Sequence, residues 1–208
     1  SYKVFKREPI STIIGNKYRI VASGPPSSGP KLIAAFNAVY ALKNERGVDL
    51  LTWDYFKKII KAADRLDKLQ YDLGDPIDPR VRDVEQKLLS KEVSELLMSD
   101  MHDSEEYGDS TRRVNTGTNV AAMDSKDLYV SAFTSLNSHF GSKVMTSDGI
   151  ILNNALSNFD DPSLNSVNVM EKGRRPSTSA VVAIVLDNED VCGTRIAIGG
   201  ADSFNVAK

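Results

Sequence analysis

The spacing of apolar residues changes once along the chain, from a period near four to a period of two. Before about residue 110 the spacing is helical and predicts helices over 31–43, 53–73 and 83–101, after a short strand at 18–24. The residues predicted to face the core of the first two helices are Leu32, Phe36, Val39 and Tyr40, then Trp53, Phe56, Ile59, Ile60 and Ala63. Thr52 is predicted to cap the second helix.

After residue 118 the pattern predicts strands, several of them apolar on both faces. The predicted strands are 120–124, 128–137, 149–154, 179–187 and 194–200, with a hairpin loop over 186–193. A polar, turn-rich stretch over 102–118 is predicted to be an exposed linker. The chain therefore divides into a helical part, 1–110, and a strand-rich part, 111–208, and the fold class is a layered α+β or α/β domain.

Composition narrows the function classes. The chain is 41% hydrophobic and 26% charged, typical of a soluble globular protein, and a formal net charge of −2 gives no field that would attract nucleic acid. A single cysteine, Cys192, excludes an internal disulfide and a cysteine-based zinc cluster. Only two histidines are present, so we expect no metal site, and no cofactor is implied.

Several ordered segments carry a family resemblance. The turn and helix "ASGPPSSGPKLIAAFNAV", the helix end "IIKAADRLDKLQYDLGDP" and the strand "YVSAFTSLNSHFGSKV" resemble γ-glutamyltransferases, also called glutathione hydrolases. The segments "GIILNNALSNFDDP", "GRRPSTS" and "AIGGA" follow in the family's order. On this resemblance, 1–110 corresponds to the end of the large subunit and 111–208 to most of the small subunit.

The resemblance implies the αββα sandwich of the N-terminal nucleophile hydrolases, here incomplete at both ends. In that family a precursor cuts itself before a threonine, which becomes the first residue of the small subunit. The threonine hydroxyl attacks the γ-glutamyl carbonyl, and its free amine can serve as the base. The activity implied is hydrolysis of γ-glutamyl compounds such as glutathione, or transfer of the γ-glutamyl group.

The nucleophile position falls in the segment "NTGTNVAAMD". In the family the nucleophile follows a glycine and precedes a small residue and a histidine. Aligning the strands without a gap places Gly117 at the nucleophile, whereas a one-residue deletion within 125–127 would place Thr118 there. Both alignments stay open, and in either one the histidine is replaced, by Asn119 or by Val120.

Other catalytic positions keep suitable groups. Ser135 matches a family threonine whose hydroxyl supports the nucleophile, so a hydroxyl remains. Gly199 and Gly200 match the double glycine whose backbone N–H groups form the oxyanion hole, a role that needs no side chain.

The substrate-binding positions are changed in part. Asn137 matches an asparagine that contacts the glutamyl group, and Thr178 and Ser179 match a serine pair that binds the substrate carboxylate. Ala155 stands where the family has an acidic residue or glutamine, and Asn158 stands where it has an aspartate; in the family these side chains hold the substrate's ammonium group. Asn158 can still accept a hydrogen bond but cannot neutralise that charge.

The family also uses an arginine of the early large subunit, whose match would precede Ser1, while the family's C-terminal end would follow Lys208. The arginine pairs 112–113 and 174–175 do not match it and are predicted to lie at the surface. The missing large-subunit portion is therefore an expected complement, in the same chain or as a partner chain.

Two functions follow from these observations. The first is a γ-glutamyltransferase-like protein that is impaired or inactive because its pocket is substituted. The alternative is an active glutathione hydrolase or transferase that processes itself before Thr118. Only the resemblance places the protein outside the cell or at its surface.

Overall fold

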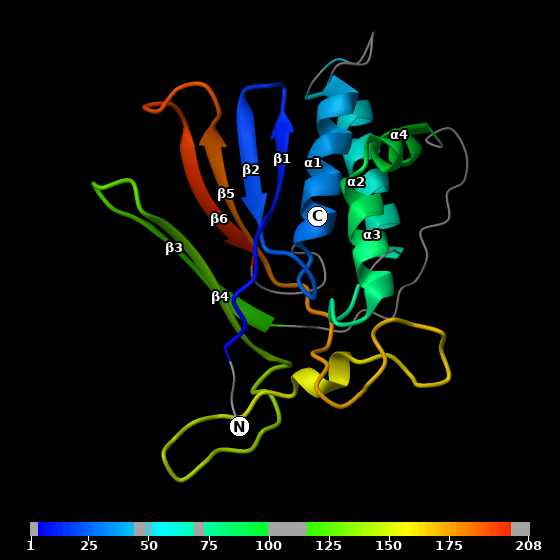
Figure 1. Ribbon diagram of the computed structural model, residues 1–208, viewed down its shortest axis with the longest axis vertical. Coiled ribbons are helices and arrows are strands. Elements are labelled where there is room, and N and C mark those ends of the chain that lie inside the picture. The colour runs from blue at the N-terminus through cyan, green and yellow to red at the C-terminus, as the bar shows by residue number, and fades with distance from the viewer. Residues whose placement is uncertain (1–3, 44–48, 50, 69–72, 100–115, 201–208) are drawn as a thin grey trace.

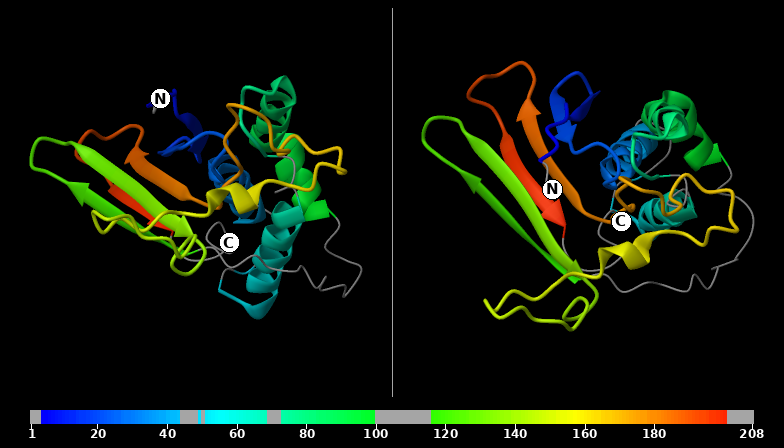
Figure 2. Two further views of the ribbon diagram at one scale, coloured as in Figure 1. Left: turned by 90° about the horizontal axis from the view of Figure 1, so that it is seen from below. Right: turned by 60° about the horizontal axis from the view of Figure 1, so that its bottom comes forward.

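The computed structural model of the protein describes residues 4–43, 49, 51–68, 73–99 and 116–200. These described residues form two antiparallel sheets and four α-helices, and the helices are gathered on one side of the larger sheet (Figure 1 and Figure 2). This arrangement confirms the predicted layered α+β class. The predicted linker over 102–118 falls largely outside the described residues.

The larger sheet has the order β1-β2-β5-β6, and every neighbouring pair is antiparallel. Its strands are β1 (Ile10–Ile14), β2 (Tyr18–Ala22), β5 (Val181–Asp187) and β6 (Arg195–Gly200). Ala22 lies opposite Ala183, so the sheet joins the N-terminal and C-terminal parts of the chain. The hairpin predicted between β5 and β6 is confirmed.

The smaller sheet is a hairpin of β3 (Thr116–Met123) and β4 (Tyr129–Asn137). It packs on the face of the larger sheet that the helices leave open, at the β5 and β6 end (Figure 2). Its outer face is exposed, as Val120 and Val130 show with exposed fractions of 61% and 57%.

The helical layer consists of α1 (Gly29–Lys43), α2 (Trp53–Lys68), α3 (Pro79–Leu89) and α4 (Lys91–Ser99). None of these described helices combines the length and apolar character needed to cross a membrane. Thr52 accepts a hydrogen bond from the backbone N–H of Tyr55 at 3.3 Å, which confirms the predicted N-cap of α2.

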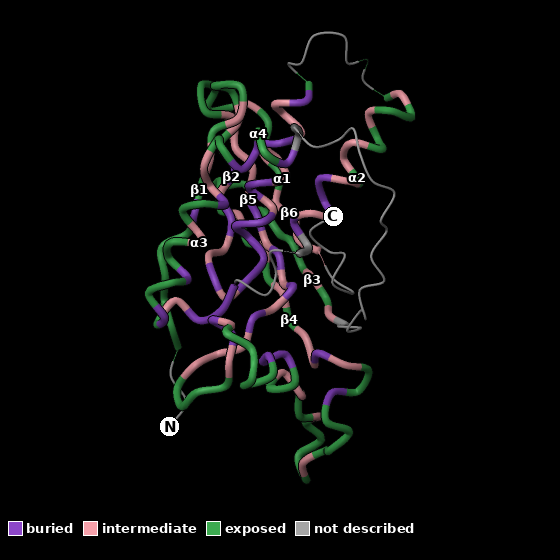
Figure 3. Tube along the Cα trace, turned by 90° about the vertical axis from the view of Figure 1, so that its right-hand side faces the viewer, coloured by how far each residue is buried: buried purple, intermediate pink, exposed green. Residues whose placement is uncertain are grey.

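Helix α1 is buried on two faces rather than one. Ile33 packs against the larger sheet, and Ala34 and Ala38 pack against the other helices. Buried positions therefore occur along α1, where the tube is purple (Figure 3). Helix α1 lies between two groups of buried residues, one shared with the larger sheet and one shared with the other helices. The predicted face is only half-buried, because Leu32 and Phe36 lie at the edge of the group shared with the sheet. A single amphipathic stripe was therefore the wrong description of this helix.

Helix α2 also buries a different face from the one predicted. Trp53 is 72% exposed, and Phe56 and Ile60 are 43% and 49% exposed. Ala62 and Leu66 pack in one buried cluster with Ala34 and Ala38 of α1, and Ala63 is also buried. Small side chains allow close helix approach, so the bulky residues are left outside, and only Ala63 of the predicted core set is buried.

Two further expectations are corrected. The helix predicted over 83–101 is two helices, because Ser90 is extended and its hydroxyl accepts from the N–H of Val93 at the start of α4. The strand predicted over 149–154 makes only one isolated bridge, between Met145 and Ile151. That segment returns on itself as a loop, with the N–H of Leu152 donating to Val144 O.

Candidate functional site

The residues around the nucleophile position lie at the start of β3, and they alternate between its two faces. Thr118 lies opposite Thr134, and both are exposed on the outer face of the hairpin. Asn119 lies opposite Phe133 and faces the larger sheet, where it touches Gly199. Adjacent strand residues point to opposite faces, so the Thr118 side chain points away from Gly199.

Gly117 faces the same side as Asn119. A Cβ atom built on Gly117 would lie 2.5 Å from Cζ of Phe133 and 3.0 Å from the carbonyl oxygen of Thr134. The Phe133 ring therefore fills the space that a side chain at position 117 would need. The ungapped alignment thus puts an inward-facing position, without a side chain, where the family has its nucleophile.

Asn119 and Ser131 lie where the two sheets meet. Asn119 Nδ2 donates to Ser131 Oγ at 3.2 Å and to the carbonyl oxygen of Ala132 at 3.0 Å. Ser131 Oγ in turn donates to the carbonyl oxygen of Ile198 in β6 at 2.7 Å. The side-chain amide of Asn119 lies so close to Gly199 that a Cβ atom at position 199 would have no room. Position 199 of β6 therefore requires glycine.

The glycine pair of the predicted oxyanion hole ends β6. Gly200 lies opposite Val181 and Gly199 opposite Val182, and both glycines are half-buried. Asn119 covers Gly199 on the side that faces the hairpin, so the structure brings this glycine to β3.

Ser135 and Asn137 lie at the end of β4 and are joined by a hydrogen bond. Ser135 Oγ accepts from the backbone N–H of Asn137 at 2.7 Å. Asn137 is 5% exposed with φ +76°, and its Nδ2 donates to Asn154 and to Ser157 Oγ. Asparagine tolerates a left-handed backbone better than most residues. The side chain of Asn137 is thus fixed against the segment before Asn158.

Asn158 closes a short 3-10 helix, η2 (Ala155–Asn158), and is 7% exposed. Its backbone oxygen accepts from Asn168 Nδ2 at 2.7 Å, and Asn168 Oδ1 accepts from the backbone N–H of Ser177 at 2.8 Å. The Nδ2 of Asn158 donates to the carbonyl oxygen of Ser177 at 3.4 Å. Within the described residues, the buried Oδ1 of Asn158 has no hydrogen-bond donor.

We call the six residues Asn137, Asn154, Ser157, Asn158, Asn168 and Ser177 the amide cluster. The sequence comparison identified only two of them, Asn137 and Asn158. The run of Asn and Ser over 153–158 was the available signal. Asn168 and Ser177 come from distant loops, and no local pattern marks them.

Thr178 and Ser179 follow the amide cluster and lead into β5. The N–H of Thr178 donates to Pro26 O at 2.9 Å, and Ser28 Oγ donates to Thr178 O at 3.0 Å. Ser179 is 5% exposed. The "PPSSG" turn before α1 therefore positions this predicted carboxylate-binding pair.

A second polar group contacts the same loop at Arg175. Asp75 is 1% exposed and accepts from Nε of Arg175 at 2.8 Å and from Arg7 at 3.4 Å. Burial alone would raise the pKa of Asp75, but the hydrogen bonds from Arg175 and from backbone N–H groups outweigh it, so the pKa is lowered.

Asp78 repeats this arrangement. It accepts from Arg80 at 2.7 Å and from Arg174 at 3.2 Å, and the hydrogen bond from Arg80 lowers the pKa of Asp78 to about 2. We call these two aspartates and their four arginines the charged clamp. The placement of Arg174 and Arg175 at the surface was wrong, since both are partly buried ion-pair partners; the pair at 112–113 lies outside the described residues.

Comparison with known proteins identifies the family of the chain. The model of the gamma-glutamyltranspeptidase family matches residues 1–206. The chain belongs to this family. It is 27% identical over 221 residues to glutathione hydrolase 7 of Homo sapiens, covering 96% of this chain and 32% of that protein. A glutathione hydrolase of Aspergillus flavus is 30% identical over 234 residues, covering 99% and 37%. The chain thus spans about a third of these relatives.

Two further proteins refine the comparison. The putative inactive glutathione hydrolase 4 of Arabidopsis thaliana is 30% identical over 146 residues, which is 62% of this chain and 76% of that protein. The structure of cephalosporin acylase from Bacillus halodurans matches with a TM-score of 0.63 and 24% identity, covering 87% of this chain and 32% of its own. This match confirms the N-terminal nucleophile hydrolase fold class.

The arrangement gives this family member hydrogen-bonding groups rather than charged ones at the candidate site. Asn137 and Asn158 belong to the amide cluster, and Ser135 Oγ accepts from the backbone N–H of Asn137. Thr178 follows Ser177 of the cluster in sequence, whereas the side chain of Thr118 lies on the outer face of β3. No set of residues able to hold a metal ion occurs in the described part of the chain.

Proposed function

We propose that this γ-glutamyltransferase-family protein has impaired or no catalytic activity and keeps the fold as a binding module. The position of Thr118 is the observation that carries the proposal. Its side chain is exposed on the outer face of β3, whereas Gly199 contacts the inner face through Asn119. A nucleophile must lie within reach of both its substrate carbonyl and the oxyanion donors, so the outward direction of Thr118 argues against that role.

The chemistry of the substrate side supports the same conclusion. Binding an ammonium group is strongest when a carboxylate lies beside it. Asn158 is neutral and Ala155 offers no polar side-chain atom. The buried Oδ1 of Asn158 can accept one hydrogen bond, so a weakened affinity for γ-glutamyl compounds such as glutathione is the ligand property that we propose.

An active enzyme remains the second candidate, because Gly117–Thr118 reproduces the family's glycine–threonine pair and the glycines of β6 are kept. In that case the backbone would be cut before Thr118. Under either proposal we expect the rest of the large subunit to complete the fold, as part of the same chain or as a partner chain. Under either proposal we also expect a location outside the cell. Accessibility of the protein to a membrane-impermeant label on intact cells tests the location.

A denaturing gel of the full-length protein, with N-terminal sequencing, separates the two functions. We expect one band and no release from a chromogenic γ-glutamyl amide. Thr118→Ala should leave both results unchanged, as should the matched control Thr134→Ala, which removes the opposing hydroxyl of β4. Two bands in the parent, abolished by Thr118→Ala but kept by Thr134→Ala, would establish the active enzyme instead.

A further inference from the structure

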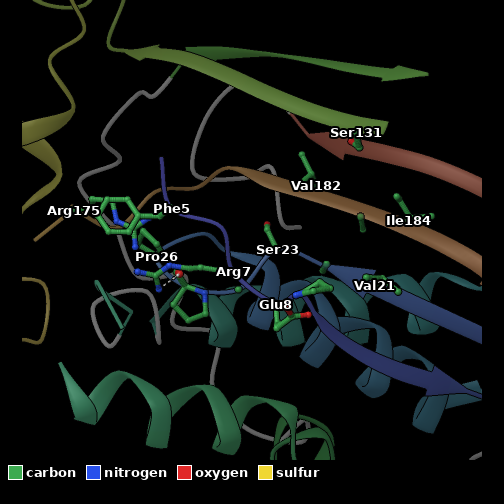
Figure 4. A pocket seen from close by; sticks show the side chains of 15 residues that line it. Phe5, Arg7, Glu8, Val21, Ser23, Pro26, Ser131, Arg175, Val182 and Ile184 are labelled. Carbon is green, nitrogen blue, oxygen red and sulfur yellow. Dashed lines mark hydrogen bonds between the residues drawn. The ribbon is translucent and has the colours of Figure 1, made fainter. Parts of the chain in front are cut away.

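A cavity of about 390 Å³ lies between the larger sheet and β4, apart from the amide cluster (Figure 4). It is of the size that small-molecule sites usually have. One wall is the N-terminal segment before β1, and another is the turn that precedes α1. Ser131 of β4 lies across the cavity from the larger sheet (Figure 4).

The wall formed by the larger sheet is apolar. Val21 of β2 and Val182 and Ile184 of β5 line it, on the face of the sheet opposite the helices (Figure 4). Val182 and Ile184 alternate with Val181 and Ala183, which are buried on the helical side. An alkyl or aryl group can be transferred from water to this surface with a favourable free energy.

The other end of the cavity carries two guanidinium groups. Arg7 and Arg175 both line it, and Phe5 covers Arg175 with its ring centroid 4.8 Å from Cζ (Figure 4). Nη2 of Arg175 is buried and makes no hydrogen bond to any described residue. Arg7 makes its two contacts, with Asp75 and with Pro25 O, at 3.4 Å, which is at the long limit of hydrogen bonding.

We propose that this cavity binds a small amphipathic carboxylate, with its carboxylate at Arg7 and Arg175 and its apolar body against Val21, Val182 and Ile184. A planar carboxylate matches the two-donor geometry of a guanidinium group. A carboxylate there would accept hydrogen bonds from Nη2 of Arg175, which makes none to a described residue, and from Arg7, whose contact with Asp75 is long. Glu8 lines the cavity away from the two arginines (Figure 4), and its charge opposes the reverse orientation of the ligand.

Titration calorimetry of the full-length protein with octanoate tests the proposal, with octanamide as the neutral counterpart of equal chain length. We expect saturable binding of octanoate and at least about tenfold weaker binding of octanamide, since only the anion forms charge-assisted hydrogen bonds. Arg7→Gln should weaken octanoate binding by about tenfold. Arg19→Gln, an exposed arginine of β2 outside the cavity, is the matched control.

A second pair of variants tests the apolar wall. Ile184→Trp fills the cavity and should abolish binding, whereas Ile13→Trp, on β1 and outside the lining, should not. A thermal melt of each variant establishes that it folds. Absence of octanoate binding, equal affinity for octanamide, or unchanged affinity in both Arg7→Gln and Ile184→Trp would overturn the proposal.

Discussion

The charged clamp and the amide cluster both make hydrogen bonds to the loop over residues 160–179, but with different kinds of side chain. The clamp buries two carboxylates, Asp75 and Asp78, and each receives hydrogen bonds from two arginines. The amide cluster uses neutral side chains, and four of its six residues are buried: Asn137, Asn158, Asn168 and Ser177. The chain can therefore hold buried carboxylates, but only where arginines from distant segments reach them.

This difference bears on the candidate site. Asn158 has no arginine or lysine partner among the interactions of the described residues, so a carboxylate there would be buried without a cation. In a family member with a carboxylate at this position, the ammonium group of the bound ligand would supply the missing cation. Neutral Asn158 is compatible with a folded protein that binds such a ligand only weakly, which agrees with the proposed loss of activity.

The largest expected effect comes from breaking the charged clamp. Asp75→Ala removes the acceptor of Arg175 Nε and of two backbone N–H groups, those of Ile77 and Arg175. Because the arginines are one-third exposed, we expect a loss of about 2–4 kcal/mol in the free energy of unfolding, measured by denaturant titration. Asp83→Ala, on the exposed side of α3, is the control. A loss below about 1 kcal/mol would show that the clamp contributes little.

Breaking the amide cluster should cost less. Asn168→Ala leaves the carbonyl oxygen of Asn158 and the N–H of Ser177 without the partner each has now, and both residues are buried. We expect a loss of about 2 kcal/mol by the same titration, because no charge is left unpaired. Asn165→Ala, at an exposed residue of the same loop, should change the free energy of unfolding by less than about 0.5 kcal/mol. Equal losses in the two variants would contradict the assigned role of the cluster.

The smallest effect is expected at the ion pair between Arg195 and Asp127, whose Nη1 and Oδ1 atoms are 3.0 Å apart. Asp127 is 61% exposed, so solvent screens the pair. Arg195→Gln should lower the free energy of unfolding by no more than about 0.5 kcal/mol. A change comparable with that of Asp75→Ala would mean that burial does not distinguish the clamp from surface pairs.

The sequence pattern was most informative where neighbouring residues decide the structure. The cap at Thr52, the strand at β2 and the hairpin between β5 and β6 depend on local spacing and turn residues, and all three were predicted. The pattern was least informative about which side of a helix is covered. Trp53 and Phe56 have core-like spacing, yet α2 packs through its alanines instead.

The candidate site shows the same division. Matching the family's motifs identified Asn137, Asn158 and the glycines of β6, but it left two alignments open at Gly117 and Thr118. The alternation of side chains along β3 gives the directions of these two residues, inward and outward. Strand alternation is a local rule, but the side that faces the larger sheet is known only once the two sheets are packed together.

The sequence by itself determined the family, the layered class and most of the helices and strands, because each depends on residue types at short range or in a fixed order. Only the tertiary structure decided the partners of Asp75 and Asp78, the amide cluster and the side of β3 on which Thr118 lies. These features join residues far apart in the sequence, such as Asp75 and Arg175. Their hydrogen bonds require geometry that no local pattern specifies, because the packing of distant segments creates it.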